Sequence, residues 1–130
     1  MEPYLAAIGI TTADMAASCR FYALLGVPVG EPPEGADHFE TTLPSGIRLM
    51  WDSVALIRQI DPDWQPPVGQ RLGLAFQCGA PSDVDSMHAA VVAAGFGSKN
   101  DPWDAFWGQR YAQVLDPDGN VVDLFAPLGD

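Results

Sequence analysis

The sequence predicts an α+β fold in which two βαβββ modules form a concave cleft within one domain. In each half of the chain, an alternating strand-like segment is followed by a helix-like segment, further extended segments and a hairpin. The hairpin turns carry Gly46 in the first half and Gly119 in the second. An internal duplication explains this repetition most simply. Because 130 residues have room for one hydrophobic core, we expect residues 1–130 to form a single domain.

The first module is expected over about residues 1–53. Apolar residues recur along residues 4–12 as in a strand, and Asp14 is a suitable N-cap for a helix over residues 15–25. Gly26 is expected to end this helix, because the residue after a helix often takes the left-handed conformation that glycine adopts easily.

Three more strands are expected in the first module. Residues 27–30 start a new extended segment, and a loop rich in proline and glycine follows at residues 31–35. Residues 39–43 and 47–52 then form a hairpin. The first module is therefore predicted to contain one helix and four strands.

A linker is expected over about residues 54–69. It begins as a short possible helix and ends in a stretch with too many prolines for regular structure. The second module follows over about residues 70–130, where Leu72, Leu74 and Phe76 alternate as in a buried strand.

The rest of the second module repeats the pattern of the first. Ser82 and Asp85 resemble a capping box, which predicts that a helix begins there, and Gly95 is expected to end it. After another extended segment, residues 109–115 and 121–125 form the closing hairpin.

The charge of the chain limits its partners. Seventeen acidic and six basic residues give a formal net charge of −11, which repels phosphate backbones and makes nucleic acid an unsuitable partner. The same charge either favours a cationic ligand or only keeps the protein soluble, and the sequence leaves both readings open.

Location and redox chemistry follow from what the sequence contains. No apolar run approaches the ~20 residues that span a bilayer, so no membrane partner is expected. The first residues carry no export signal, which predicts a cytoplasmic protein. Cys19 and Cys78 have no metal-ligand spacing and are interpreted as buried free thiols.

Two groups of motifs carry a family resemblance. They are Ile8-Gly9-Ile10-Thr11-Thr12-Ala13-Asp14 with Phe21-Tyr22 and Leu25-Gly26, and Trp107-Gly108-Gln109-Arg110-Tyr111-Ala112 with Asp116-Pro117-Asp118-Gly119-Asn120. They resemble the opening and closing segments of a vicinal oxygen chelate module, the superfamily of glyoxalases, bleomycin-resistance proteins and ring-cleaving dioxygenases. The second group is most like the metal-free bleomycin-resistance type. The resemblance implies a U-shaped cleft and a homodimer in which the partner chain completes that cleft.

The resemblance also implies where a divalent metal would bind. The four ligand positions of the superfamily's enzymes fall on Ala7, Arg48, Gly73 and Asp123, and only Asp123 can ligate a metal. We therefore expect no metal ion and no other cofactor. An ion pair between Arg48 and Asp123 is expected to replace the metal cross-link.

Strand alternation predicts which side chains face the cleft. Starting from the implied ligand positions, the cleft side is expected to carry Ala7, Gly9, Thr11, Arg48, Met50, Asp52, Gly73, Ala75, Gln77, Val121, Asp123 and Phe125. The opposite side is expected to form the core under the helices, with Ile8, Ile10, Ile47, Leu49, Trp51, Leu72, Leu74, Phe76, Val122 and Leu124. The small cleft residues leave room for a bulky ligand, or alternatively let strands approach closely.

The remaining aromatic residues predict a stacking surface. A tryptophan left in water forfeits much of its burial free energy, so exposed tryptophans favour a planar apolar ligand. The alternatives are a dimer interface or a loop packed on the domain. The predicted ligand-binding residues are Phe39, Arg48, Met50, Asp52, Trp64, Trp103, Trp107, Tyr111, Asp123 and Phe125.

These observations favour a metal-independent protein that binds and sequesters a drug or natural product. One alternative is an enzyme of the same superfamily, either metal-dependent or metal-free, in which Asp52, Asp123 or His38 acts as a general base. Another is a structural or regulatory dimer that binds no ligand, which predicts a cleft filled by its own side chains.

Overall fold

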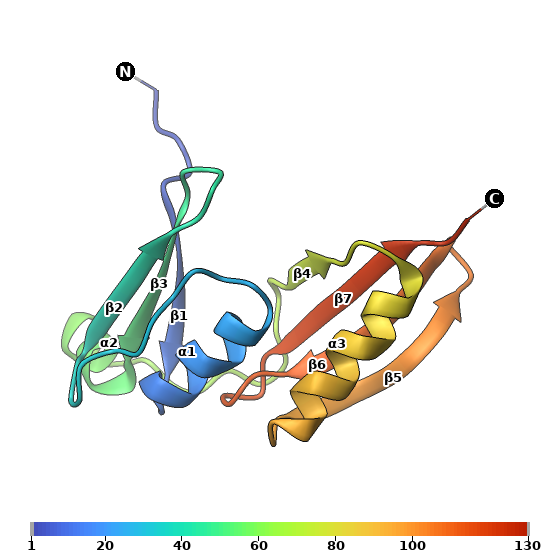
Figure 1. Ribbon diagram of the computed structural model, residues 1–130. Coiled ribbons are helices and arrows are strands. Elements are labelled where there is room, and N and C mark those ends of the chain that lie inside the picture. The colour runs from blue at the N-terminus through green and yellow to red at the C-terminus, as the bar shows by residue number, and fades with distance from the viewer. Residues whose placement is uncertain (1, 130) are drawn as a thin grey trace. The chain divides into compact units, whose positions relative to one another are not determined.

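The computed structural model describes residues 2–129 as two compact units, the first ending at Pro66 and the second beginning at Pro67 (Figure 1). Each unit is an α+β assembly of one sheet and the helices that pack against it. None of the helices in this part of the chain is long and apolar enough to cross a membrane.

The first unit contains three strands and two helices. The strands are β1 (Ala7–Thr12), β2 (His38–Thr42) and β3 (Arg48–Ser53), and the helices are α1 (Met15–Leu24) and α2 (Val54–Ile60). The sheet order is β1-β3-β2, with β1 parallel and β2 antiparallel to the central strand β3.

The ends of α1 follow the sequence prediction. The Asp14 side chain accepts a hydrogen bond from the Ala17 amide at 3.1 Å, and this satisfies one of the free N–H groups of the first turn. Gly26 has a φ of 93°, a conformation that costs glycine little because it has no Cβ. The helix therefore begins and ends where its local sequence specifies.

The prediction of a strand over residues 27–30 is wrong. The Val29 amide donates to the Val27 carbonyl at 2.8 Å, so the chain turns here instead of running along a neighbour. Pro28 has no N–H to give to a ladder, and its carbonyl accepts from the Thr41 hydroxyl at 2.6 Å. The first unit consequently has three strands, and the hairpin of β2 and β3 completes its sheet.

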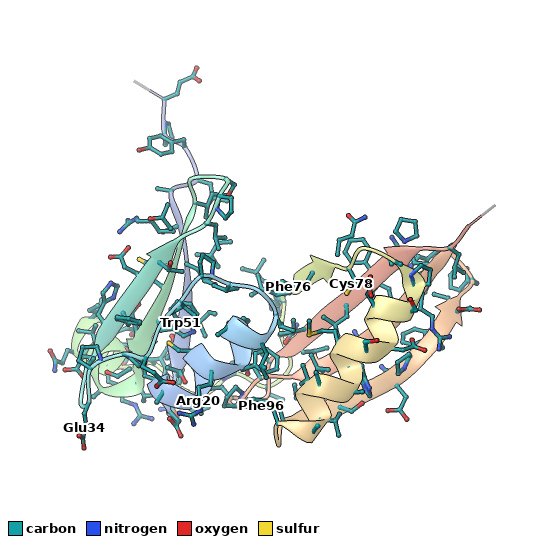
Figure 2. All side chains as sticks on the ribbon, viewed as in Figure 1. Arg20, Glu34, Trp51, Phe76, Cys78 and Phe96 are labelled. Atoms are coloured by element: carbon teal, nitrogen blue, oxygen red, sulfur yellow. The ribbon has the colours of Figure 1, made fainter. Side chains whose placement is uncertain are left out.

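The core of the first unit centres on Trp51 of β3, which is fully buried, as the strand alternation predicts. Figure 2 places Trp51 between β3 and α1. Its indole N–H donates to the buried Ser18 hydroxyl of α1 at 3.1 Å, and the Tyr22 ring lies 6.0 Å from it. This hydrogen bond satisfies the one polar atom that the tryptophan brings into the core.

The second unit is a βαβββ module, as predicted. Its elements are β4 (Leu74–Gln77), α3 (Pro81–Ala93), β5 (Gly97–Ala105), β6 (Gln109–Leu115) and β7 (Val121–Pro127). The sheet order is β4-β7-β6-β5, with β4 parallel to β7 and the other pairs antiparallel. Figure 1 shows α3 lying along one face of this sheet.

The predicted capping box of α3 does not form. The helix begins at Pro81, its N-cap is Ala80, and no side chain bonds to the first turn. Ser82 already lies inside the helix, where its carbonyl accepts from the Ser86 hydroxyl. Proline is well suited to the first helical position, because that residue needs no amide donor and φ is already helical.

Leu72 is 90% exposed and does not belong to the core, contrary to the prediction. The strand β4 begins only at Leu74, which pairs with Val122. One residue earlier on β7, Val121 pairs with Leu115 of β6 but is bound on its β4 side by a side chain. The Gln70 amide accepts from the Val121 N–H at 2.8 Å and donates to its carbonyl at 3.0 Å. Gln70 therefore takes the place of a further ladder pair.

The core of the second unit lies between α3 and the sheet. Val84 and Val91 of the helix are fully buried, and α3 contacts both β6 and β7. The strands contribute alternate residues to this face, namely Ala112, Val114, Val122, Leu124 and Ala126, all of them buried. The opposite face carries the intermediate positions and is not covered by this helix.

We predict that Ser18→Ala destabilises the protein by about 1–3 kcal/mol, because the buried Trp51 N–H loses the hydroxyl that accepts its hydrogen bond. Chemical denaturation followed by tryptophan fluorescence measures this change. The matched control is Ser86→Ala on the exposed side of α3, expected to change stability by no more than about 0.5 kcal/mol. Equal effects for the two variants would contradict the prediction.

Candidate functional site

The uncovered face of the second sheet brings five of the predicted ligand-binding residues together. Tyr111 lies opposite Phe125 and Trp103 in the strand registers, and cross-strand partners share a face. Asp123 lies two residues before Phe125 on β7, so it occupies the same face. Trp107 follows β5 in the turn that leads to β6. We call these five residues the aromatic face.

The rings of the aromatic face pack against one another at steep angles. The Trp107 ring centroid lies 5.1 Å from Tyr111 and 6.2 Å from Trp103, with interplanar angles of 80° and 90°. Trp103 and Tyr111 are 5.5 Å apart, and Phe125 stacks on Tyr111 at 6.4 Å. Edge-to-face contacts of this kind hold each ring in one orientation.

Asp123 is the charged group of this face. Its carboxylate accepts a short hydrogen bond from the Tyr111 hydroxyl and a second one from the Gln113 side-chain amide at 2.9 Å. Gln113 is itself held by the Asn100 amide on the neighbouring strand. A carboxylate offers about four acceptor positions, so two donors leave Asp123 able to accept from a ligand as well.

Tyr111 remains a neutral hydrogen-bond donor over the whole physiological range. Partial burial, and then the hydrogen bond to Asp123, raise the pKa of the Tyr111 hydroxyl to about 12. Its proton therefore stays in place and holds the Asp123 carboxylate.

The uncovered face of the first sheet carries charged residues in place of aromatic ones. His38 lies opposite Asp52, and its ring nitrogens approach Asp52 at 2.6 Å and Glu40 at 3.1 Å. Arg48 donates to the other Glu40 oxygen at 2.8 Å. Met50 lies beside these residues, near Gly9 of β1. We call His38, Glu40, Arg48 and Asp52 the charged row.

Two predicted ligand residues lie elsewhere. Phe39 pairs with Trp51, so it shares the face that packs under α1 and not the face of Met50 and Asp52. Its neighbours in the β2 sequence decide this, because adjacent residues in a strand point to opposite faces. Trp64 lies under the Arg58 guanidinium, 5.5 Å from the ring centroid, which is a cation–π contact within the first unit.

Two residues that hold Asp123 were not predicted from the sequence. Gln113 donates to the Asp123 carboxylate, and Asn100 holds Gln113. The alternation along β6 was a usable signal for Gln113, since it lies two residues after Tyr111. The pairing of Asn100 needed the β5–β6 register, which contains irregular steps on both sides of this residue.

Comparison with known proteins identifies the family. Residues 4–124 match the model of the Glyoxalase/Bleomycin resistance protein/Dioxygenase superfamily. The chain belongs to this superfamily. No curated protein matches its sequence.

Several solved structures share the fold of this chain. A glyoxalase/bleomycin resistance protein/dioxygenase from Nocardioides is 23% identical, with a TM-score of 0.74 over 98% of this chain and 85% of the other. A glyoxalase-related enzyme from Fulvimarina pelagi is 23% identical, with a TM-score of 0.79 over 95% and 87%. A protein from Agrobacterium tumefaciens is 25% identical, with a TM-score of 0.74 over 98% and 100%.

The metal that the superfamily's enzymes use does not fit the residues found here. Ala7 and Gly73 bring no side-chain donor, and the Arg48 guanidinium is a cation bound to Glu40. Asp123 supplies the only carboxylate of the four positions, and one carboxylate gives too few donors to hold a divalent metal. Within residues 2–129, no group of three or more His, Cys, Asp or Glu side chains can hold a metal ion.

Arg48 and Asp123 each have partners within their own unit. Arg48 binds Glu40, and Asp123 binds Tyr111 and Gln113. The expected ion pair between Arg48 and Asp123 stays a prediction, and these observed contacts satisfy both groups without it.

We predict that Tyr111 stays protonated at about pH 10.5, where an ordinary tyrosine is mostly ionised. Phenolate absorbance at that pH should be equal in the wild type and in Tyr111→Phe, because burial and Asp123 keep the pKa of Tyr111 at about 12. Circular dichroism at the same pH checks that both proteins remain folded. A larger phenolate signal in the folded wild type would show that Tyr111 ionises normally.

Proposed function

We propose that this protein binds a planar aromatic small molecule on its aromatic face and holds it without changing it chemically. The observation that carries the proposal is the set of rings from Trp103, Trp107, Tyr111 and Phe125 around the carboxylate of Asp123. Four rigid aromatic walls beside one charged acceptor suit a ligand that is apolar over most of its surface and polar at one place.

Exposure of the aromatic groups supports a ligand on this face. Trp107 is 48% exposed, and its neighbour Phe106 is 97% exposed, although rings of this size gain free energy when they are buried. The Trp107 indole N–H donates to the Gln109 side chain at 2.7 Å, so the exposed ring is held in place and does not rotate freely. A preoriented ring loses little entropy when a ligand stacks on it.

Charge supports a ligand with a positive group or with N–H donors. The donors to Asp123 are the uncharged Tyr111 hydroxyl and Gln113 amide, so neither contact places a positive charge beside this carboxylate. The net charge of −11 attracts cations to the whole surface. Sequestration needs no more than this, because it requires affinity and no reactive group.

A metal-dependent enzyme of the superfamily is the first alternative, and the residues at the ligand positions argue against it. A metal-free enzyme is the second, with His38 as its base. The two carboxylates that contact the imidazole favour its protonated form, and a protonated imidazole cannot accept a proton. The contacts of His38 therefore favour binding over base catalysis.

The homodimer, the cytoplasmic location and the cleft expected from the sequence belong to this proposal as predictions. The superfamily resemblance motivates the dimer. Antibiotic resistance through sequestration is the biological role that the proposed activity would serve.

We predict that Trp107→Ala weakens binding of a planar aromatic ligand at least about tenfold, because loss of one stacked ring removes both area burial and the stacking geometry. A library of planar aromatic compounds, cationic and neutral, is first screened by tryptophan fluorescence. Calorimetry then measures the affinity of the best compound for wild type and variant.

The matched control is Trp64→Ala, which removes a tryptophan that contacts Arg58 and lies outside the aromatic face. Its affinity should equal that of the wild type, and both variants should remain folded by circular dichroism. Stacking also persists at high salt, whereas ionic attraction is screened within about 8–10 Å at physiological ionic strength. Unchanged affinity of Trp107→Ala at low and high salt would refute the proposal.

We predict that divalent metals do not stabilise the protein. Ligands that bind only the native state raise the melting temperature, and Ala7, Arg48 and Gly73 give a metal no donors. The melting temperature with Ni²⁺, Mn²⁺, Zn²⁺ or Fe²⁺ should equal the melting temperature in buffer without divalent metal. A rise in melting temperature that Asp123→Asn removes would overturn the metal-independent assignment.

A further inference from the structure

The charged row on the first sheet links two carboxylates and two cations in a line. The His38 Nδ1 lies 2.6 Å from Asp52 Oδ1, and its Nε2 lies 3.1 Å from Glu40 Oε1. Glu40 Oε2 in turn accepts from Arg48 at 2.8 Å. His38 is therefore the only member of this row whose charge changes near neutral pH.

The protonation state of His38 sets the total charge of the row. With a protonated imidazole, His38 and Arg48 balance Asp52 and Glu40. With a neutral imidazole, one negative charge is uncompensated. Arg48 continues to neutralise Glu40, with which it makes a direct ion pair, so the excess charge lies at Asp52.

Asp52 also has space beside it. Its Oδ1 contacts His38, whereas its Oδ2 has no hydrogen-bond partner within residues 2–129. A Cβ added at Gly9 would lie 4.0 Å from this Oδ2 and 3.9 Å from the Met50 methyl carbon, with no closer atom. Gly9 is exposed and has no side chain, so the carboxylate oxygen and the apolar methyl group border the position that a Cβ would occupy.

We propose that His38 makes the charged row a proton-regulated site for an organic cation, which binds beside Asp52 over Gly9 when the imidazole is neutral and is repelled when it is protonated. The proposal goes beyond the proposed function by adding a second site, and it rests on that function only for the class of ligand, a flat apolar molecule with a positive group. The site is a feature of the first unit alone.

The contacts of His38 favour its protonated form and so move the regulation to higher pH. The hydrogen bond to Asp52, and then that to Glu40, raise the pKa of His38 above its ordinary value of 6.5. The protonated imidazole, which repels cations, therefore persists above pH 6.5. The site becomes able to bind a cation as the pH rises through the raised pKa of His38. Asp52 and Glu40 are the charged groups that act on His38 directly, and Arg48 acts through Glu40.

Thermodynamic linkage gives the proposal a second observable. If protonation of His38 weakens cation binding, a bound cation must lower the pKa of His38 by the corresponding amount. The chain has two histidines, so His88 in the second unit is an internal reference in the same sample.

The experiment uses benzamidinium chloride as the planar cation and benzamide as its neutral counterpart. Both are titrated into protein with ¹⁵N-labelled histidines, and nuclear magnetic resonance follows the two imidazoles from about pH 5 to about pH 9. Benzamidinium should lower the pKa of His38 and leave that of His88 unchanged, and benzamide should change neither. Benzamidinium affinity should rise about threefold to fivefold across this range, the size expected for charges that are partly exposed.

Variants separate the proposed mechanism from general electrostatics. His38→Gln should bind benzamidinium with an affinity that no longer depends on pH, whereas His88→Gln should keep the wild-type dependence. Gly9→Val fills the space beside Asp52 and should abolish the response of His38 while all charges remain. Circular dichroism confirms that each variant is folded.

Two results would overturn the proposal. One is a pKa of His38 that benzamidinium does not change, and the other is a pH dependence that survives in His38→Gln. The failure of the proposed function is distinct, because it would appear as unchanged ligand affinity in Trp107→Ala on the second unit. Suppose that tryptophan fluorescence detects ligand binding at the aromatic face and that benzamidinium does not change the pKa of His38. This result would reject the inference and leave the proposed function intact.

Discussion

The alternation of side chains along each strand is the constraint on which the rest of this structure depends. Helix α1 packs on one face of the first sheet and α3 on one face of the second, so every second residue is committed to the core and the residues between them are not. In β3 this places Trp51 under α1 and puts Met50 and Asp52 on the other side. A one-residue slip of the register would exchange the two sets, so the core fixes the site.

Both uncovered faces use hydrogen-bonded side chains at positions where enzymes of the superfamily place metal ligands. Asp123 is held by Tyr111 and Gln113, and Arg48 is held by Glu40. These contacts satisfy charged groups that would otherwise pay a desolvation cost on a half-buried sheet. They also leave the two faces chemically different, since aromatic rings dominate one and ionic groups the other.

The elements that the sequence predicted correctly have local signals. Asp14 and Gly26 define α1 because capping depends on residues within one turn. The segment after α1 was predicted incorrectly, since strand identity also needs a neighbouring backbone and Pro28 offers no donor to one. The prediction that Leu72 lies in a buried strand was wrong for a related reason. Its alternation with Leu74 suited a strand, but the distant Gln70–Val121 contact ends the ladder before it.

The candidate site divides in the same way. The sequence by itself determined the family, the aromatic residues Trp103, Trp107, Tyr111 and Phe125, and the missing metal donors, because each depends on residue type and on spacing along one strand. Only the tertiary structure decided that Phe39 lies with Trp51 and that His38 lies between Asp52 and Glu40. These pairings arise from the register between strands, and register is set by the packing of the whole sheet on its helix and not by local sequence.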